Sequence, residues 1–291
     1  MFKGVITAIV TPFKEGEVDY EKFEELIEWQ IENKVQGILP CGTTGESATL
    51  SHQEHKDIIK FVVSIVKKRV PVIAGTGSNN TMEAIDLTES AKKDGADAAL
   101  LITPYYNKPT QEGLYRHFSL ICESVDIPVI LYNVPTRTGV NMLPSTIAKL
   151  AKNVPNIIGV KEASGSIDQT SEILQLTEEK ISVLSGDDSL TLALISVGAK
   201  GVISVVSNIA PDKMRSLCDY ALCGNFEEAR KIHYKLFPLM KALFIETNPI
   251  PVKKALYLMN KINDEIRLPL TLMSQENIEK LKDAMKKAGV L

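Results

Sequence analysis

Eight short apolar runs alternate with longer segments of helical period along most of the chain, and this alternation constrains the fold more than any other feature. The runs are rich in Val, Ile and Leu and bounded by Gly or Pro: GVITAIVTP, GILPCG, PVIAG, AALLITP, PVILYNV, IIGVKEA, ISVLSG and GVISVVS. Strands that are apolar on both faces are typical of a parallel sheet covered by helices. The sequence therefore predicts an α/β fold of eight strand–helix units.

The number of units favours a closed (β/α)8 TIM barrel over residues 1–225. An open doubly wound parallel sheet is the alternative. From Phe226 onward the apolar runs stop, and three further segments of helical period follow: FEEARKIHYKLFPLMKALFIE, PIPVKKALYLMN and SQENIEKLKDAMKKAG. We therefore expect a C-terminal helical domain over residues 226–291, packed on the barrel.

Charge and composition narrow the class of partner. The 291 residues carry a net charge of −3, which provides no basic footprint for nucleic acid or for an anionic membrane surface. The N-terminal residues lack the pattern of a secretory signal, and no apolar stretch reaches the ~18 residues of a membrane span. We expect a cytoplasmic protein that acts on small molecules.

The four cysteines indicate neither a disulfide framework nor a metal site. Cys41, Cys122, Cys218 and Cys223 form no C-x-x-C pair and have no histidines at zinc spacing. We expect them to be small buried apolar residues.

In a (β/α)8 barrel, the active site lies at the C-terminal ends of the strands and in the loops that follow. In this chain those positions carry CGTTGE, GTGSN, TPYYNKP, YNVPTRTG, VKEASG, SGDDS and SVVSN. We therefore expect the functional residues to lie in these seven segments.

Lys161 differs from most other lysines because it ends an apolar strand run, IIGV. An amine held in apolar surroundings has a lowered pKa and can form a Schiff base with a carbonyl. Two plainer interpretations are a lysine paired with a carboxylate such as Glu162, or one that reaches solvent from the strand end. Position alone does not separate these three.

The ends of the second and the fifth strand run carry groups that a Schiff-base enzyme would need. Gly42 and Gly45 flank Thr43 and Thr44, and together they offer backbone N–H groups and two hydroxyls to a carboxylate. Tyr132 supplies a phenol that could relay protons near the imine. A plain turn and a core aromatic are the alternatives for these motifs.

Taken together, GTTGE at 42–46, YNVP at 132–135 with the following RTG, and GVKEAS at 159–164 resemble the dihydrodipicolinate synthase (4-hydroxy-tetrahydrodipicolinate synthase) family of Schiff-base aldolase-type enzymes. The resemblance covers essentially the whole chain. It implies that pyruvate is condensed with L-aspartate 4-semialdehyde, the first committed step of the diaminopimelate route to lysine. Neither pyridoxal phosphate nor a metal is implied, because the covalent pyruvate imine carries the chemistry.

The resemblance also implies a role for each matching residue. Lys161 would form the imine, Thr43 and Thr44 would bind the pyruvate carboxylate, and Tyr132 would shuttle protons. The further matching positions are Tyr106, which completes a hydroxyl relay with Thr44 and Tyr132, and Gly186 and Ile203, whose backbone carbonyls would face the site.

Arg137 is the residue that discriminates between substrates. N-acetylneuraminate lyase and 2-keto-3-deoxy-sugar aldolases share the lysine, the tyrosine and GTTGE, so these fix the reaction class only. A semialdehyde that carries a carboxylate requires a guanidinium, whereas a sugar requires hydroxyl and amide partners. A loop salt bridge is the alternative for Arg137.

Two other functional classes fit the sequence less well. For a dinucleotide- or phosphate-binding enzyme, GTGSN lacks the third glycine of the fingerprint, and a catalytically silent ligand sensor would lack Lys161 or Tyr132.

The resemblance further implies a homo-oligomer, usually a dimer of dimers, in which Tyr106 reaches the active site of the neighbouring subunit. A loop tyrosine packed within its own subunit is the alternative.

A second constellation matches the positions that bind lysine in inhibited members of the family: Ser47, Ala48, His52, His55, Asn79, Glu83 and Tyr105. A carboxylate for the ammonium groups and polar donors for the other end make chemical sense for this ligand. The competing interpretation takes Ser51 to Glu54 and Asn80 to Glu83 as capping boxes, with the histidines as first-turn groups on a solvated face.

Overall fold

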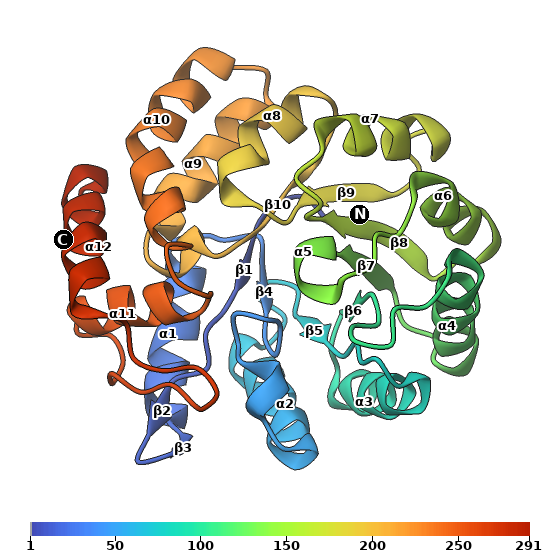
Figure 1. Ribbon diagram of the computed structural model, residues 1–291, viewed down its shortest axis with the longest axis horizontal. Coiled ribbons are helices and arrows are strands. Elements are labelled where there is room, and N and C mark those ends of the chain that lie inside the picture. Colours follow the sequence, from blue (N-terminus) through green and yellow to red (C-terminus); the bar gives the residue numbers. More distant parts are fainter. Residues whose placement is uncertain (1) are drawn as a thin grey trace.

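The computed structural model describes residues 2–291, and its centre is a ring of eight parallel strands (Figure 1). The strands are β1 (Gly4–Ala8), β4 (Gly37–Leu39), β5 (Ile73–Gly75), β6 (Ala98–Ile102), β7 (Val129–Asn133), β8 (Ile157–Glu162), β9 (Ser182–Ser185) and β10 (Gly201–Ser204). Their order in the sheet is β4-β1-β10-β9-β8-β7-β6-β5, and a parallel bridge between Ile38 and Val72 joins the two edges. The predicted TIM barrel is confirmed, and the open-sheet alternative is wrong.

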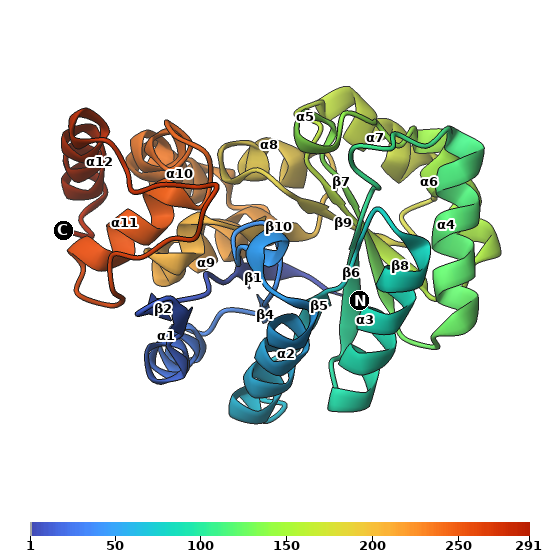
Figure 2. The same ribbon diagram turned by 60° about the horizontal axis from the view of Figure 1, so that its bottom comes forward.

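Each barrel strand leads to a helix on the outside of the ring. These helices are α1 (Tyr20–Glu32), α2 (His52–Val66), α3 (Thr81–Asp94), α4 (Gln111–Ser124), α6 (Pro144–Asn153), α7 (Ile167–Leu176), α8 (Thr191–Ser196) and α9 (Pro211–Leu222). Short elements interrupt some connections: α5 (Pro135–Thr138) and the 3-10 turns η1 (Ser47–Thr49), η2 (Asp188–Leu190) and η3 (Val206–Asn208). α5 lies over the end of β7 (Figure 2).

The periodicity of two along each strand separates two hydrophobic cores. Ile6, Leu100, Ile130, Leu184 and Ile203 belong to a cluster inside the barrel. The alternate residues of the same strands pack outward against the helices, in two larger clusters. A residue's position along its strand therefore decides whether it faces the barrel interior or the helical layer.

Two local features differ from the sequence-based expectations. A small antiparallel hairpin, β2 (Phe13–Lys14) and β3 (Glu17–Val18), lies between β1 and α1 and was not predicted. All four cysteines are free thiols, and three of them are buried as expected. Cys223 is exposed, so the expectation is wrong for that residue: it follows the last residue of α9, at a turn that faces solvent.

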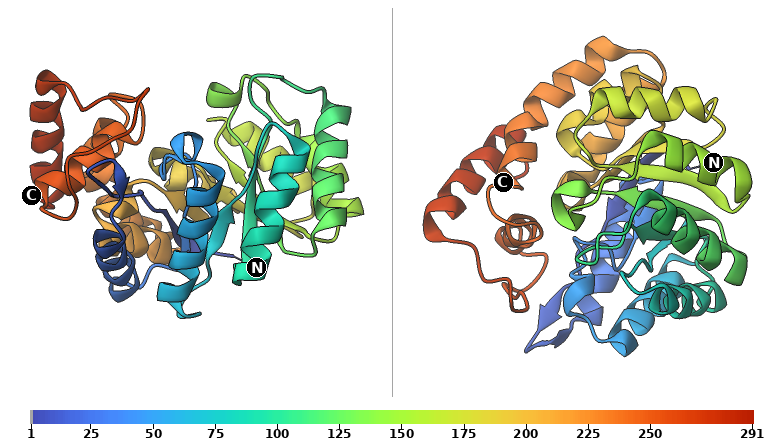
Figure 3. Two further views of the ribbon diagram at one scale, coloured as in Figure 1. Left: turned by 90° about the horizontal axis from the view of Figure 1, so that it is seen from below. Right: turned by 45° about the vertical axis from the view of Figure 1, so that its right-hand side comes forward.

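The last part of the chain forms the three predicted helices α10 (Phe226–Ala242), α11 (Ile250–Leu258) and α12 (Gln275–Ala288). They lie to one side of the barrel, in orange and red (Figure 3). Their apolar side chains belong to the same core cluster as those of α1 and α9. The division into two domains at residue 226 stays a prediction. None of the helices in the described chain is long and apolar enough to cross a membrane.

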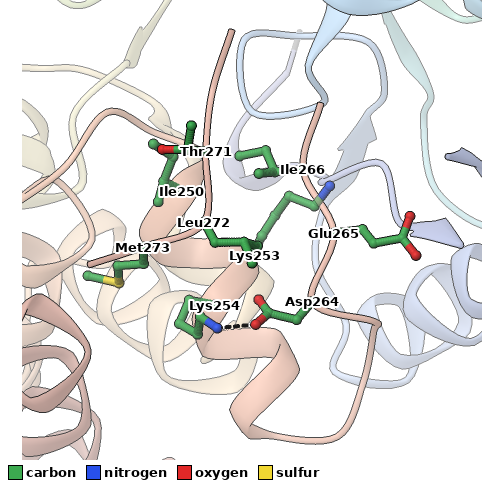
Figure 4. A pocket seen from close by; sticks show the side chains of 9 residues that line it. All are labelled: Ile250, Lys253, Lys254, Asp264, Glu265, Ile266, Thr271, Leu272 and Met273. Carbon is green, nitrogen blue, oxygen red and sulfur yellow. Dashed lines mark hydrogen bonds and ion pairs between the residues drawn. The ribbon is translucent and has the colours of Figure 1, made fainter. Parts of the chain in front are cut away.

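A buried ion pair fastens α11 to the barrel. Lys253 Nζ lies 2.5 Å from Glu46 Oε1, and the two side chains are only 4% and 1% exposed. Glu46 follows β4, and its second oxygen accepts the backbone N–H of Arg267 at 3.1 Å. The neighbouring Lys254 points to another side of α11, where it pairs with Asp264 (Figure 4). The C-terminal segment is thus tied to a loop at the C-terminal end of the strands.

Replacing Lys253 with alanine should lower the free energy of unfolding strongly. The substitution leaves the buried Glu46 carboxylate without its cation, and breaking such a pair typically costs about 3–5 kcal/mol. Urea denaturation of the variant and the parent protein measures the effect. The control is Lys282→Ala, which removes a surface ion pair with Glu279 and should cost less than about 1 kcal/mol. Equal, small losses in both variants would contradict the anchoring role of Lys253.

Candidate active site

Tyr132 and Lys161 lie side by side on adjacent strands and face the barrel interior. The parallel register pairs Tyr132 on β7 with Lys161 on β8. Each residue is only 6% exposed, and the Lys161 amine lies 4.3 Å from the centroid of the Tyr132 ring. The two candidate reactive groups therefore meet, as predicted from their positions at strand ends.

The alternative in which Lys161 pairs with Glu162 is wrong. Consecutive strand residues point to opposite faces, so Glu162 lies in the outer layer, where it accepts hydrogen bonds from Asn133, Ser164 and Gln169. Among residues 2–291, no carboxylate forms an ion pair with Lys161. Nor does Lys161 extend to bulk solvent from the strand end, given its burial. Its amine is left facing the interior of the barrel.

The Gly42–Gly45 turn after β4 brings two hydroxyls to the same space. The turn is closed by a hydrogen bond from Gly45 N to Gly42 O at 3.1 Å. Thr44 is buried and Thr43 is partly buried. The hydroxyl oxygen of Thr44 accepts a hydrogen bond from Asn248 Nδ2 at 3.0 Å, which fixes its position.

Arg137 lies on α5, the single helical turn after β7. Pro135 begins this turn and Gly139 ends it with a φ of 72°, in the left-handed region that glycine tolerates. The guanidinium donates to the backbone carbonyl of Asn248 at 3.2 Å, and it forms no ion pair within the described chain. The loop salt bridge considered for Arg137 is therefore absent from residues 2–291, and this exposed cation faces a cavity.

A cavity of about 660 Å³ joins these groups. Six of the predicted catalytic and substrate-binding residues line it: Thr43, Thr44, Tyr132, Arg137, Lys161 and Gly186. At Gly186 a Cβ atom would lie 2.6 Å from the Cβ of Ala163, so a larger residue would force the wall of the cavity to shift. No cluster of three His, Cys, Asp or Glu residues in the described chain is arranged to hold a metal ion.

Two predicted residues do not line this cavity. Ile203 packs inside the barrel, below the cavity wall formed by Val205. Tyr106 is 90% exposed and has a φ of 70°, which is uncommon for a residue with a side chain. Its phenol does not reach the cavity of its own chain.

Comparison with known proteins places the chain in a family. A model of the dihydrodipicolinate synthetase family matches residues 1–288. The chain belongs to this family. It is 58% identical to a 4-hydroxy-tetrahydrodipicolinate synthase of Thermodesulfovibrio yellowstonii over 291 residues, which cover all of both chains.

Solved structures agree with this membership. A dihydrodipicolinate synthase of Acinetobacter baumannii, complexed with pyruvate, is 48% identical, with a TM-score of 0.98 and full coverage of both chains. An enzyme of the same name from Cyanidioschyzon merolae, with lysine bound, is 44% identical, with a TM-score of 0.97, and the match covers 100% of this chain and 99% of that one.

In this member of the family, a second cavity of about 440 Å³ adjoins the first and shares Thr43, Arg137, Thr247 and Asn248 with it. Six of the seven residues predicted to bind lysine line it: Ser47, Ala48, His52, His55, Glu83 and Tyr105. Asn79 is not part of the lining. Its side chain instead donates to the carbonyl of Tyr105 at 3.2 Å.

The capping interpretation of these residues is half correct. Ser51 and Glu54 form the reciprocal capping box at the start of α2. Asn80 caps α3, but the Glu83 carboxylate accepts from the Ser78 hydroxyl at 2.8 Å instead of completing a box. His55 is not on a solvated face: it is buried, with Nε2 2.6 Å from the carbonyl oxygen of Gly75, and burial lowers its pKa. Glu83 therefore remains available to the second cavity.

Sequence reasoning missed Asn248, which joins the two cavities. Its side chain donates to Thr44, its carbonyl accepts from Arg137, and its Oδ1 has no hydrogen-bond partner within the described chain. The residue lies between α10 and α11, far along the sequence from any strand end. The one available signal is the Asn-Pro dipeptide, which marks a turn but no function.

Proposed function

We propose that this chain is a 4-hydroxy-tetrahydrodipicolinate synthase that condenses pyruvate with L-aspartate 4-semialdehyde. The observation that carries the proposal is the buried Lys161 amine beside the Tyr132 ring, in a cavity that also holds Thr44 and Arg137. The full-length relatives of that name support the choice of reaction. The reaction is the first committed step of lysine biosynthesis by the diaminopimelate pathway, and we infer a cytoplasmic location for it.

Lys161 would attack the keto carbon of pyruvate, and water would leave as the imine forms. Tyr132, whose ring lies beside the amine, would pass protons to and from the amine and the departing oxygen. Thr43 and Thr44 would hold the pyruvate carboxylate through their hydroxyls and backbone N–H groups. Loss of a methyl proton then gives an enamine, whose carbon attacks the aldehyde of the second substrate.

Arg137 would bind the carboxylate of the semialdehyde, because it is an unpaired cation at the wall of the same cavity. The amine of the semialdehyde can then attack the imine carbon, which closes the ring and releases Lys161. The imine serves as the electron sink throughout, so the proposal requires neither pyridoxal phosphate nor a metal.

We propose that Tyr106 acts on the active site of a neighbouring copy in a homo-oligomer. Its exposure of 90% and its absence from the cavity of its own chain support this assignment. Thr44, Tyr132 and the neighbour's copy of this tyrosine would then form the hydroxyl relay. A dimer of dimers is the state we infer from the family.

Borohydride added with pyruvate should attach a three-carbon unit to Lys161 and inactivate the enzyme. Reduction traps the imine as a stable secondary amine, and mass spectrometry of peptides locates it. Lys161→Ala should abolish the adduct, whereas Lys200→Ala should not. Lys200 directly precedes β10, at the opposite end of the barrel from the cavity, and pairs with Glu179. Dialysis against a chelator should leave activity intact. An active parent protein without an adduct would contradict the imine.

Arg137→Ala should raise the KM for aspartate semialdehyde about 10- to 100-fold while changing the KM for pyruvate by less than about threefold. Loss of a charge-assisted partner typically costs about 1.5–3 kcal/mol, which corresponds to that range. Steady-state kinetics with each substrate varied in turn measure the difference. Arg116→Ala on α4 is the control, since that arginine pairs with Glu112 at the surface. Equal increases for both substrates would show that Arg137 supports the loop instead.

We propose that free lysine binds the second cavity and inhibits, with the Glu83 carboxylate receiving an ammonium group. Shared wall residues connect this cavity with the active site. Calorimetry should detect lysine binding to the parent protein and lose it in Glu83→Gln. Glu89→Gln, at an exposed position of the same helix α3, should bind like the parent. Binding that survives in Glu83→Gln places the ligand elsewhere.

A further inference from the structure

Directly behind the Tyr132–Lys161 pair, on the outer face of the same two strands, lies a buried polar network that the proposed chemistry does not use. The register that pairs Tyr132 with Lys161 also pairs Asn133 with Glu162. Asn133 is fully buried and Glu162 is 2% exposed. The Asn133 amide donates to the Glu162 carboxylate at 3.1 Å, so the two strand ends are joined by side chains as well as by backbone.

The buried Glu162 carboxyl group has no cationic partner in the described chain. Within residues 2–291 it forms no ion pair, and it is satisfied instead by neutral donors. One carboxylate oxygen accepts from Ser164 N at 2.6 Å, and the other accepts from Asn133 Nδ2 and Gln169 Nε2, both at 3.1 Å. Burying a carboxyl group is costly unless it is hydrogen-bonded, so these donors are needed to keep Glu162 at this position.

Two more amides complete what we call the Glu162 network: Asn133, Asn141, Glu162 and Gln169. Asn141 and Gln169 exchange hydrogen bonds at 2.8 and 3.2 Å. Asn133 also donates to Asn141 Oδ1 at 2.8 Å, and its own Oδ1 accepts from Met142 N at 2.9 Å. Both amide hydrogens of Asn133 and both of Gln169 therefore have acceptors.

The contacts of Asn133 close a loop that contains Arg137. The chain leaves β7 at Asn133, passes through α5 and returns at Asn141 and Met142, where the Asn133 side chain holds it. One side chain thus fixes both the end of the strand that carries Tyr132 and the far end of the segment that carries Arg137. The Asn133 side chain is also tied, through its hydrogen bond to Glu162, to the strand that carries Lys161.

We propose that the Glu162 network is a positioning device for the reaction: it sets the placement of the Lys161 amine relative to Tyr132 and to Arg137. This inference rests on the proposed function, because the groups it positions are the imine-forming lysine, the proton relay and the carboxylate-binding arginine. Asn133 and Glu162 are positioning residues, since neither lines the cavity.

The decisive experiment moves the carboxylate from one strand to the other. In Glu162→Gln, the amide oxygen must still accept from Ser164 N. The new NH2 group then faces the NH2 groups of Asn133 and Gln169, so donors meet donors. In Asn133→Asp, a second carboxylate faces Glu162. The double variant Asn133→Asp/Glu162→Gln restores one carboxylate and one amide across the strand pair, and rotation of the amides of Asn141 and Gln169 re-pairs every group.

The measured quantity is the rate at which borohydride traps the pyruvate adduct on Lys161, with the melting temperature recorded for each variant. The trapping rate of each single variant should be about tenfold or more below that of the parent, because small misplacements of reacting groups slow a reaction by that factor or more. The double variant should recover most of the loss, the signature of coupled neighbours. Glu172→Gln, at an exposed position of α7, is the control and should match the parent.

The outcomes separate the inference from the proposed function. A parent protein that forms no adduct overturns the proposed function and this inference with it. A parent that forms the adduct, with Glu162→Gln trapped at the same rate, overturns the inference alone. So does a double variant that regains the melting temperature but not the rate, since the network then supports folding only.

A variant at the edge of the network covers the case in which Glu162→Gln does not fold. Gln169→Ala removes one donor to the Glu162 carboxylate from the partly buried face of α7, away from the strand pair. The same trapping assay should show a loss of about three- to tenfold at an unchanged amount of folded protein. An unchanged rate in this variant would overturn the inference.

Discussion

The register between β7 and β8 is the constraint on which the rest of the site depends. Parallel pairing aligns Tyr132 with Lys161 and Asn133 with Glu162, and alternation along the strands then sends the first pair inward and the second outward. A shift of β8 by one residue would exchange its faces, leaving the Glu162 carboxylate in the cavity and the Lys161 amine among the helices, and a shift of β7 would likewise turn Tyr132 outward. The phenol, the amine and the network behind them therefore depend on one choice of register.

The GTTGE turn joins this strand pair to the C-terminal helices. Thr44 faces the cavity, while Glu46, two residues later, forms the buried ion pair with Lys253 on α11. The same C-terminal segment returns Asn248 to Thr44 and to Arg137. The segment between α10 and α11 is thus part of the cavity wall. The glutamate of the GTTGE motif anchors this segment and does not itself line the cavity.

Much of the fold follows from local pattern, because each buried parallel strand must be apolar on both faces and each strand is followed by a helix. The same pattern located Lys161, Tyr132 and Arg137, since strand ends of a barrel converge. Long-range contacts were not accessible in this way. Asn248 meets Thr44 across 204 positions of the chain, and the two-residue strands of the β2–β3 hairpin are too short to leave a periodic signal. The roles of Gly186, Ile203, Tyr106 and the lysine-site residues came from family resemblance, and Tyr106 lies outside the cavity of a single chain.

Buried carboxylates at strand ends show that this end of the barrel is not built for maximal stability. After β9, the strand that pairs with β8, the Asp188 carboxylate accepts from Ser204 Oγ at 2.5 Å and from the N–H groups of Val205 and Val206 at 2.9 and 3.0 Å. Burial still raises the pKa of Asp188 from 3.8 to about 6, so desolvation outweighs these three hydrogen bonds.

A carboxyl group whose pKa is raised by folding stabilises the folded state most below pH 3.8, and this stabilisation is lost as the pH rises through about 6. At neutral pH, Asp188 therefore lowers the free energy of unfolding by on the order of 3 kcal/mol, compared with its value at acidic pH. The hydrogen bonds nevertheless hold the turn after β10, where Val205 forms part of the cavity wall. At Asp188, stability at neutral pH is therefore exchanged for a fixed geometry of the cavity wall.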